Sequence, residues 1–505
     1  MTLHLHRADR TDRLADGLAQ LLVTPLADPF AEEFVVVPAK GVERWLTQRL
    51  SLHLGVGPRG GDGVCAGVRF VNPRSLIALL TGTELTDPWD PDRIVWPLLN
   101  VVDRHLEAPE LAMLARHLGT GQTGVEAELR RGRRYSVARR IAGLFASYAV
   151  QRPQLLVDWR GGRDTDGSGL ALDTDLTWQP HLWRLLVDQL PDDPPDVRHT
   201  RALGALREDT MVELPSRLSL FGHTRLPVTE IELLGALGEH REVHLWLPQA
   251  SPGLWAAIAG PVAVGPVRRR EDRSADLAGP PLLASLGRDS RELERSLLGS
   301  GLPLEDDPVV AEYAEPASLL TWLQRDLRAN VAPGPEVRAG RVLSTNDRSL
   351  QVHACHGAGR QVGVLREVLV GLLQDDPTLE PRDIVVMCPD IEAYAPLVQA
   401  GFGLGIDSPG SHPAHLLRVR LADRGLSSTN PLLAIAGSLV ALAGSRAAAS
   451  EVLDLAACEP VRRRFGFGDD DLERLARWVA QAGIRWGLDA AHRAPYHLQR
   501  IEQNT

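Results

Sequence analysis

Lysine is almost absent from this sequence. Lys40 is the only lysine, so every other residue among the 55 lysines and arginines is arginine. A phosphate-binding P-loop has the pattern Gly-x-x-x-x-Gly-Lys-Ser/Thr, in which glycines bring backbone N–H groups to the phosphates and lysine supplies charge. Lys40 follows Pro38-Ala39 and precedes Gly41-Val42, so the required glycines and the hydroxyl are missing. The sequence therefore excludes an intact P-loop anywhere in the chain.

Cysteines are few, and long apolar runs are missing. The four cysteines, Cys65, Cys355, Cys388 and Cys458, are too widely spaced for a disulfide framework, so we expect a reducing, cytoplasmic location. No apolar stretch reaches the about 18 residues that a membrane-spanning helix needs. The first residues also lack the apolar segment of a signal peptide. We expect no membrane association.

An excess of positive charge is absent too. The net charge is −10 and the sequence pI is about 5.9, whereas a general binder of nucleic acid is basic overall. The chain has 44% hydrophobic and 24% charged residues, a globular composition whose length suggests roughly two to four domains. Contact with DNA would therefore need local basic patches.

What the sequence does contain is alternating strand and helix patterns, which predict an α/β fold with parallel sheets. A mostly helical insertion is expected over about 74–210, with a Gly/Asp/Ser-rich loop near 160–175. Pro333, Gly334, Pro335 and Gly340 indicate a linker over 331–349. The expected strands are 3–6, 34–37, 218–222, 243–247, 350–355 and 384–388, and the expected helices outside the insertion are 10–22, 42–53, 228–238 and 361–373.

Several segments, in the same order along the chain, resemble the RecC family, the gamma subunits of the exodeoxyribonuclease V (RecBCD) helicase–nuclease. The strongest are His353-Ala354-Cys355-His356 with Arg360 to Leu365, and Asp375 to Met387. Others are Gly41 to Ser51, Phe221-Gly222, Leu226-Pro227, Leu282 to Ser285, and Gly483 to Gly487.

The resemblance implies a helicase-like fold that has lost its ATPase motifs. Residues 1–330 would form a degenerate P-loop-like domain 1A with the helical insertion, and 350–505 a second domain, 2A, incomplete at its C-terminus. Family members are much longer, so we expect this chain to be an N-terminal part, with the strand-splitting element beyond residue 505. ATP and magnesium would be used by the RecB-like beta and RecD-like alpha partners, and this chain would bind no cofactor.

The densest basic run contains six arginines around Tyr135, and such a run could track a phosphate backbone. The alternative is a solvated helix face in an arginine-rich chain. The six are Arg130, Arg131, Arg133, Arg134, Arg139 and Arg140. For Arg268 to Arg270 we favour a solvated loop, and for Arg462 to Arg464 partner contact or surface pairing with nearby aspartates.

The resemblance also implies a strand-scanning surface drawn from three segments. The residues of this chain that match it are Pro38, Lys40 and Arg44, then Asn72 and Ala78, then Leu144 and Arg152. Family members that read a recombination hotspot carry acidic residues at the positions of Gly143 and Ala146. We therefore expect general strand binding here rather than reading of that hotspot. The alternative for Leu144 and Phe145 is core packing.

No constellation predicts a metal or catalytic site. His353, Cys355 and His356 lack the second ligand pair that a zinc site normally has. Gly357-Ala358-Gly359 is followed by no lysine, and Asp383 and Asp390 alone do not form a nuclease centre.

The sequence thus favours a non-catalytic, DNA-binding scaffold subunit of a helicase–nuclease that processes double-strand DNA ends for recombinational repair. Two alternatives stay open. One is an active helicase or nuclease with a divergent nucleotide site at Lys40. The other is a scaffold that contacts only proteins.

Overall fold

The computed structural model divides the chain into two compact units, Met1–Gln351 and Val352–Thr505. It describes residues 3–500 except 29, 56–62, 84–86, 125, 126, 128, 129, 131, 211–215, 261–270, 310–312, 314, 316, 403–412 and 422–429. The division falls close to the expected linker, although α15 (Leu319–Ala329) and α16 (Pro335–Ala339) lie in and beside it.

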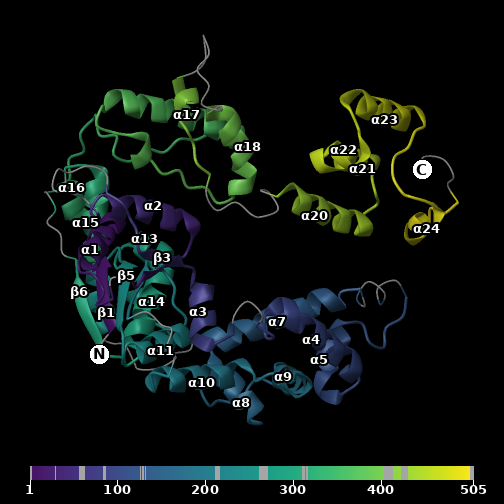
Figure 1. Ribbon diagram of the computed structural model, residues 1–505, viewed down its shortest axis with the longest axis horizontal. Coiled ribbons are helices and arrows are strands. Elements are labelled where there is room, and N and C mark those ends of the chain that lie inside the picture. The colour runs from purple at the N-terminus through teal and green to yellow at the C-terminus, as the bar shows by residue number, and fades with distance from the viewer. Residues whose placement is uncertain are drawn as a thin grey trace. The chain divides into compact units, whose positions relative to one another are not determined.

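The first unit is built on a six-stranded sheet in which every strand pair is parallel (Figure 1). The strand order is β3-β2-β4-β5-β1-β6. The strands are β1 (Leu3–Ala8), β2 (Glu33–Val36), β3 (Val68–Val71), β4 (Arg217–Phe221), β5 (Glu242–Pro248) and β6 (Leu304–Pro308). Parallel pairing needs helical crossovers, and the alternating patterns of the sequence supply them.

Helices cover both faces of this sheet. On one face α1 (Thr11–Val23) and α2 (Lys40–Ser51) bury leucines such as Leu18 and Leu46 against Val35 and Trp246. The opposite face is covered by α3 (Pro73–Thr81), α10 (Pro195–Arg207), α11 (Val228–Leu237) and α14 (Arg288–Leu298). Two further helices, α12 (Pro252–Ala259) and α13 (Pro281–Leu286), also lie between β5 and β6 in the chain. Burial on both faces agrees with the apolar run Phe34 to Val37 at β2, whereas the edge strand β6 carries the exposed Glu305, Asp306 and Asp307.

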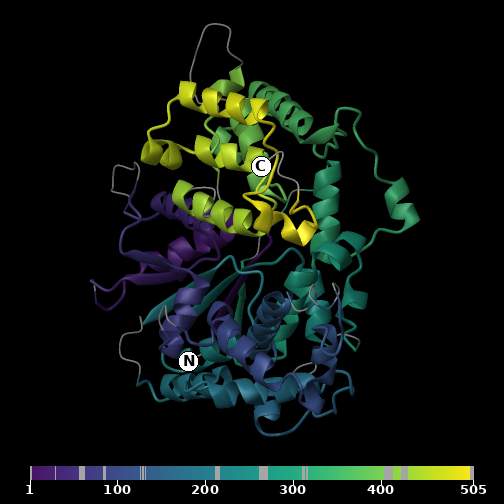
Figure 2. The ribbon, with the colours of Figure 1, turned by 90° about the vertical axis from the view of Figure 1, so that its right-hand side faces the viewer.

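A group of helices between β3 and β4 in the chain has a core of its own. It comprises α4 (Pro91–His105), α5 (Ala112–His117), α7 (Arg134–Gln151), α8 (Pro153–Arg160) and α9 (Trp178–Gln189). Buried side chains such as Phe145, Trp159 and Trp183 hold these helices together. Figures 1 and 2 show the insertion beside the sheet within the first unit.

Among the described residues of the second unit, helices are the main regular elements, and one isolated β-bridge joins Ala448 and Trp486. Its helices are α17 (Gly357–Asp375), α18 (Ile391–Phe402), α20 (Pro431–Gly444), α21 (Ala449–Ala457), α22 (Glu459–Phe465), α23 (Asp469–Gln481) and α24 (Ala490–Arg493). A small core joins α17 and α18 through Val362, Val398 and Phe402. From α20 to α23 no helix buries a described residue.

The prediction of strands at 350–355 and 384–388 is wrong for this chain. The helix between them forms as α17, but neither segment pairs with another strand among the described residues. Val352, Val385 and Met387 are 92%, 80% and 90% exposed. A strand needs a hydrogen-bonding neighbour, and here the apolar pattern is present without one. The first unit's predicted strands and helices all form.

Candidate nucleic-acid interface

The carboxyl ends of β3, β2 and β4 lie side by side along one edge of the sheet. Val36 of β2 pairs with Val71 of β3 on one side and Leu220 of β4 on the other. The Val37 N–H also donates to the Val71 carbonyl at 3.0 Å, which continues the pairing past β2. Residues that follow these strands therefore gather at this edge, where open parallel sheets usually bind ligands.

Lys40 and Arg44 follow β2 on the first turns of α2. The helix starts at Lys40 because Ala39, its N-cap, is still extended. Positions four apart share a helix face, so the two cations lie one above the other, and both side chains are exposed. Trp45 beside them is 37% exposed, with its ring 6.3 Å from that of Phe221 at the end of β4.

Asn72 follows β3 directly and caps α3. Its side-chain oxygen accepts a hydrogen bond from the Ser75 N–H at 2.9 Å, and Pro73 occupies the first helical position. Such a cap stabilises a helix by about 1 kcal/mol. The side chain is exposed, so the remaining amide hydrogens face solvent. Asn72 thus has a structural role that does not use its amide donors.

The C-terminal end of α7 reaches the same edge. The Thr229 hydroxyl, on the first turn of α11 after β4, donates to the Val150 carbonyl at 3.1 Å. Arg152, two residues further on, is exposed between α7 and α8. Leu144 lies about two turns before it and is 37% exposed, whereas the adjacent Phe145 is buried. Core packing therefore explains Phe145 and leaves Leu144 partly open to solvent.

We call Lys40, Arg44, Asn72, Leu144 and Arg152 the carboxyl-edge surface. The structure places these predicted residues on elements that meet at one edge of the sheet, although they are far apart in the sequence. The geometry suits a strand of nucleic acid, since cations contact phosphates and an amide can contact bases.

Two titratable groups with shifted pKa values, the buried His223 and the partly buried Glu230, follow β4 in the chain. His223 follows β4 and is 4% exposed, and burial lowers its pKa to about 4. Glu230 lies on the first turn of α11, where burial raises its pKa to about 7. Burial disfavours the charged form in both cases. His223 is therefore neutral near pH 7, and Glu230 is partly protonated.

The usual nucleotide crevice of such a sheet lies elsewhere, between β1 and β5. α1 leaves β1 on one face of the sheet, while the helices that follow the adjacent β5 cover the other face. Ligands of open α/β sheets bind where the helices that follow two adjacent strands leave toward opposite faces of the sheet. The Lys40 turn follows β2 instead, so Lys40 does not lie at the switch point.

Side chains of the protein itself fill this crevice. Asp9, directly after β1, accepts hydrogen bonds from the Tyr313 hydroxyl and, at 3.1 Å, from Nη1 of Arg328. The Arg328 guanidinium lies 3.6 Å from the centre of the Tyr313 ring, and that of Arg13 lies 4.8 Å from it. The Ser251 hydroxyl after β5 donates to the Arg328 carbonyl at 3.3 Å. We call Asp9, Arg13, Tyr313 and Arg328 the crevice cluster.

The crevice cluster is unfavourable for a nucleotide phosphate. A phosphate loop exposes backbone N–H groups through glycines, but the turn after β1 is Ala8-Asp9-Arg10-Thr11. The Asp9 carboxylate would repel a phosphate, and the end of α15 occupies the adjoining space. At Gly253, on α12, an added Cβ would lie 2.6 Å from the Ala329 carbonyl oxygen, so glycine permits this close approach.

Comparison with known proteins decides the family. Residues 3–330 match the family described as RecC, N-terminal domain, and residues 429–505 match the RecBCD enzyme subunit RecC fourth domain. The chain belongs to the RecC family. The family match over the first unit agrees with the resemblance that the sequence suggested.

Curated RecC-family relatives match along the whole chain. The RecBCD enzyme subunit RecC of Mycobacterium tuberculosis H37Rv is 57% identical over 507 residues, which cover 100% of this chain and 45% of the relative. The Mycolicibacterium smegmatis subunit is 58% identical over 99% of this chain and 44% of its own length. The Escherichia coli K12 subunit is 29% identical over 100% and 46%. This chain thus spans less than half the length of these relatives.

The first part of the arginine run, up to Arg134, lies far from Arg152 in this RecC-family chain. Arg133 and Arg134 lie at the start of α7, whose 18 residues separate them from Arg152 by about 27 Å. Arg134 pairs with Asp103 at 2.8 Å, Arg139 lies 3.7 Å from Asp92, and Arg130 donates to the Arg116 carbonyl at 3.5 Å. Arg131 and Arg268 to Arg270 lie outside the described residues. The predicted DNA-binding residues therefore form two groups.

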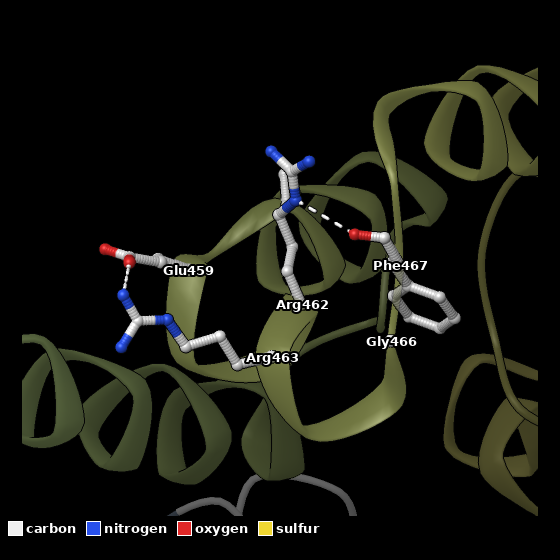
Figure 3. A pocket seen from close by; sticks show the side chains of 6 residues that line it. Glu459, Arg462, Arg463, Gly466 and Phe467 are labelled. Carbon is white, nitrogen blue, oxygen red and sulfur yellow. Dashed lines mark hydrogen bonds and ion pairs between the residues drawn. The ribbon is translucent and has the colours of Figure 1, made fainter.

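Arg462 and Arg463 are engaged in local pairing, as the sequence favoured. Figure 3 shows Arg463 pointing toward Glu459, with which it pairs, and Arg462 donating to the Phe467 carbonyl at 3.3 Å. Arg462 also pairs with Asp469 at 2.6 Å. These residues line a shallow pocket together with Ala457 and Gly466. The charges of its two arginines are therefore already balanced by the carboxylates of Glu459 and Asp469.

The remaining candidates form no site. His353 and His356 are exposed in the segment before α17, where the Cys355 thiol lies 3.9 Å from the His353 carbonyl. Within the described part of the chain, no three His, Cys, Asp or Glu side chains are arranged to hold a metal ion. No helix in that part is long and apolar enough to cross a membrane.

Sequence reasoning missed Asp9, Tyr313 and Arg328. The sequence predicts a turn after the first strand, but it does not predict the order of the strands in the sheet. It therefore could not indicate that β1, rather than β2, lies at the crevice. The contact between Asp9 and Tyr313 joins residues 304 positions apart, which no local pattern predicts.

Proposed function

We propose that this chain is a non-catalytic, strand-guiding part of an exodeoxyribonuclease V subunit, acting on double-strand DNA ends in recombinational repair. Single strands would run over the carboxyl-edge surface toward partner subunits that hold the motor and nuclease sites. The names of the relatives, RecBCD enzyme subunit RecC, support assembly with RecB-like beta and RecD-like alpha subunits.

The crevice cluster supports the part of the proposal that this chain does not itself hydrolyse ATP. An ATPase of this fold class needs a phosphate loop at the β1–β5 switch point. Asp9, Tyr313 and Arg328 occupy that point. ATP and magnesium would then be bound by the partners, and this chain would need no cofactor.

The carboxyl-edge surface supports the strand-binding half. Lys40, Arg44 and Arg152 are exposed cations on a chain whose net charge is −10, so the positive charge is local. Phosphate contacts of this kind contribute affinity and position a strand without reading its sequence. The uncharged Gly143 and Ala146 nearby offer no acceptor for bases, which favours general binding over hotspot reading.

The domain scheme follows from the same reasoning. We infer that the first unit is a degenerate P-loop-like domain 1A with the helical insertion, and that residues 350–505 belong to a second helicase-like domain. The parallel sheet supports the first inference, and the unpaired apolar segments at 350–355 and 384–388 support the second. Cytoplasmic action follows from the DNA substrate.

The two alternatives make different predictions. An active helicase with its nucleotide site at Lys40 would hydrolyse ATP when DNA is present, and Lys40→Ala would abolish that activity. A scaffold that contacts only proteins would bind its partners but not DNA. The position of Lys40 away from the switch point disfavours the first alternative, and the cations around it disfavour the second.

The test is to purify this chain alone and with a RecB-like subunit, and to measure ATPase activity and binding to forked DNA. The proposal expects no DNA-stimulated ATPase from the chain alone, together with forked-DNA binding that weakens steeply with salt. ATPase activity lost in Lys40→Ala would refute it. Binding of the partner without any binding of DNA would favour the protein scaffold.

A further inference from the structure

An exposed pair of aromatic side chains lies on the helical insertion, outside the carboxyl-edge surface. Trp96 on α4 and Tyr135 on α7 have ring centroids 5.4 Å apart, with an angle of 39° between the ring planes. Trp96 is 61% exposed and Tyr135 is 43% exposed. In the sequence Tyr135 is marked only by the arginines around it, and no pattern marks Trp96.

The pair occupies the middle of the outer seam between two antiparallel helices. On one side of it Arg139 lies 3.7 Å from Asp92, and on the other Arg134 pairs with Asp103 at 2.8 Å. The inner side of the same helix pair is the core of the insertion, where Leu98 and Ile141 are buried. The packed inner side holds the two helices together, and the aromatic pair lies on their outer side.

Exposure of both rings leaves apolar surface in water. Fully buried aromatic side chains cover about 150–250 Å² each, so the exposed part of Trp96 alone is roughly 100 Å². A single exposed apolar residue is ordinary on a protein surface. Two neighbouring rings between two ion pairs form a larger exposed aromatic surface than a single residue would.

The surrounding charge indicates an anionic ligand. α4 and α7 together contain five arginines and two aspartates. Arg93, one turn before Trp96, is exposed, as are Arg133 and Arg140 around the start of α7. This local excess contrasts with the net charge of −10 of the whole chain. Aromatic rings beside arginines are the usual means of binding single-stranded nucleic acid without sequence preference.

We propose that Trp96 and Tyr135 form a stacking platform for unpaired bases of single-stranded DNA, with Arg93, Arg133 and Arg139 contacting the phosphates on either side. This platform rests on the proposed function and adds a second contact site to it. α7 connects the two sites, because its N-terminal end carries Tyr135 and its C-terminal end reaches Arg152. A strand following α7 would span about 27 Å between them.

The test is binding of a fluorescent oligo(dT) strand to the purified chain, as wild type and as Trp96→Ala. Loss of stacking on one base is expected to raise the Kd about 5- to 150-fold, which corresponds to about 1–3 kcal/mol. Trp96→Phe keeps a ring and should restore most of the affinity. Arg93→Ala should lower the slope of log K against log salt by about 0.7.

The matched control is Trp478→Ala, which removes another exposed tryptophan, 56% exposed on α23, and should leave the Kd unchanged. If Trp96→Ala binds oligo(dT) like the wild type while Lys40→Ala binds more weakly, the platform is refuted and the proposed function stands. If the wild type does not bind oligo(dT), both are refuted. If Trp96→Ala reduces co-purification with a RecB-like subunit but not oligo(dT) binding, the seam is a protein-docking surface and the platform is refuted.

Discussion

Replacing Asp9 by alanine is expected to loosen the end of α15 from the crevice between β1 and β5. Asp9 accepts hydrogen bonds from Tyr313 and Arg328, and the two charged side chains are only 12% and 20% exposed. Exposed ion pairs contribute about 0–1 kcal/mol, and breaking a fully buried pair costs about 3–5 kcal/mol. This pair is intermediate, so we expect a loss of about 2 kcal/mol.

Hydrogen exchange of the α15 backbone amides measures this loss, since local opening reports local stability. A loss of about 2 kcal/mol corresponds to roughly 30-fold faster exchange, at 1.4 kcal/mol per tenfold change. Asp12→Ala, on the first turn of α1, is the control for loss of a nearby aspartate. Asp12 pairs with Arg10, whose side chain is 58% exposed, so its loss should change α15 exchange by less than about fivefold. Equal effects of the two substitutions would refute the assignment of Asp9 to the crevice cluster.

Two further predictions concern stability. In Gly17→Ala the new Cβ would lie 2.8 Å from the buried Trp246 ring, and this overpacking should destabilise the first unit by about 1–3 kcal/mol. The better helix propensity of alanine offsets about 1 kcal/mol of that loss. In Gly143→Ala, on α7, the new Cβ would meet no atom within 4 Å, so this substitution should stabilise the first unit by about 0.5–1 kcal/mol. Urea unfolding compares the two variants, and changes of the same sign in their free energy of unfolding would contradict the packing argument. The second prediction concerns pH: burial lowers the pKa of His223 to about 4 and that of His244 to about 3. The unfolded chain then binds more protons below pH 6.5, so stability should fall from pH 6.5 toward pH 4 by about 1.4 kcal/mol per unit for each histidine. His223→Leu should flatten this slope in urea unfolding, and an unchanged slope would exclude His223 as its source.

Much of the first unit was predictable because its signals are local. The strands around Val35, Leu220 and Leu245 are buried on both faces and are mostly apolar, with Ser219 and His244 as polar exceptions. The helices between them carry clear apolar spacing, and the glycine turn at Gly222 (φ 76°) ends β4 as expected. The α/β class and the insertion follow from these patterns.

Other features depend on contacts between distant segments. The apolar pattern of 384–388 is that of a buried strand, but a strand forms only beside a hydrogen-bonding neighbour, and the described residues supply none. The Trp96–Tyr135 pair likewise depends on how α4 packs against α7. The surface residues Lys40, Asn72 and Arg152 were named from the family resemblance, and only the sheet order explains why they lie at one edge.

The most direct test of strand guiding is a salt titration of forked-DNA binding by the wild type and by the triple variant Lys40→Ala, Arg44→Ala and Arg152→Ala. Each phosphate contact on a single strand contributes about 0.7 to the slope of log K against log salt. The proposed function predicts a steep wild-type slope that falls by about 2 in the variant, with unchanged helix content. Identical slopes for the two proteins would show that the carboxyl-edge surface does not contact the strand.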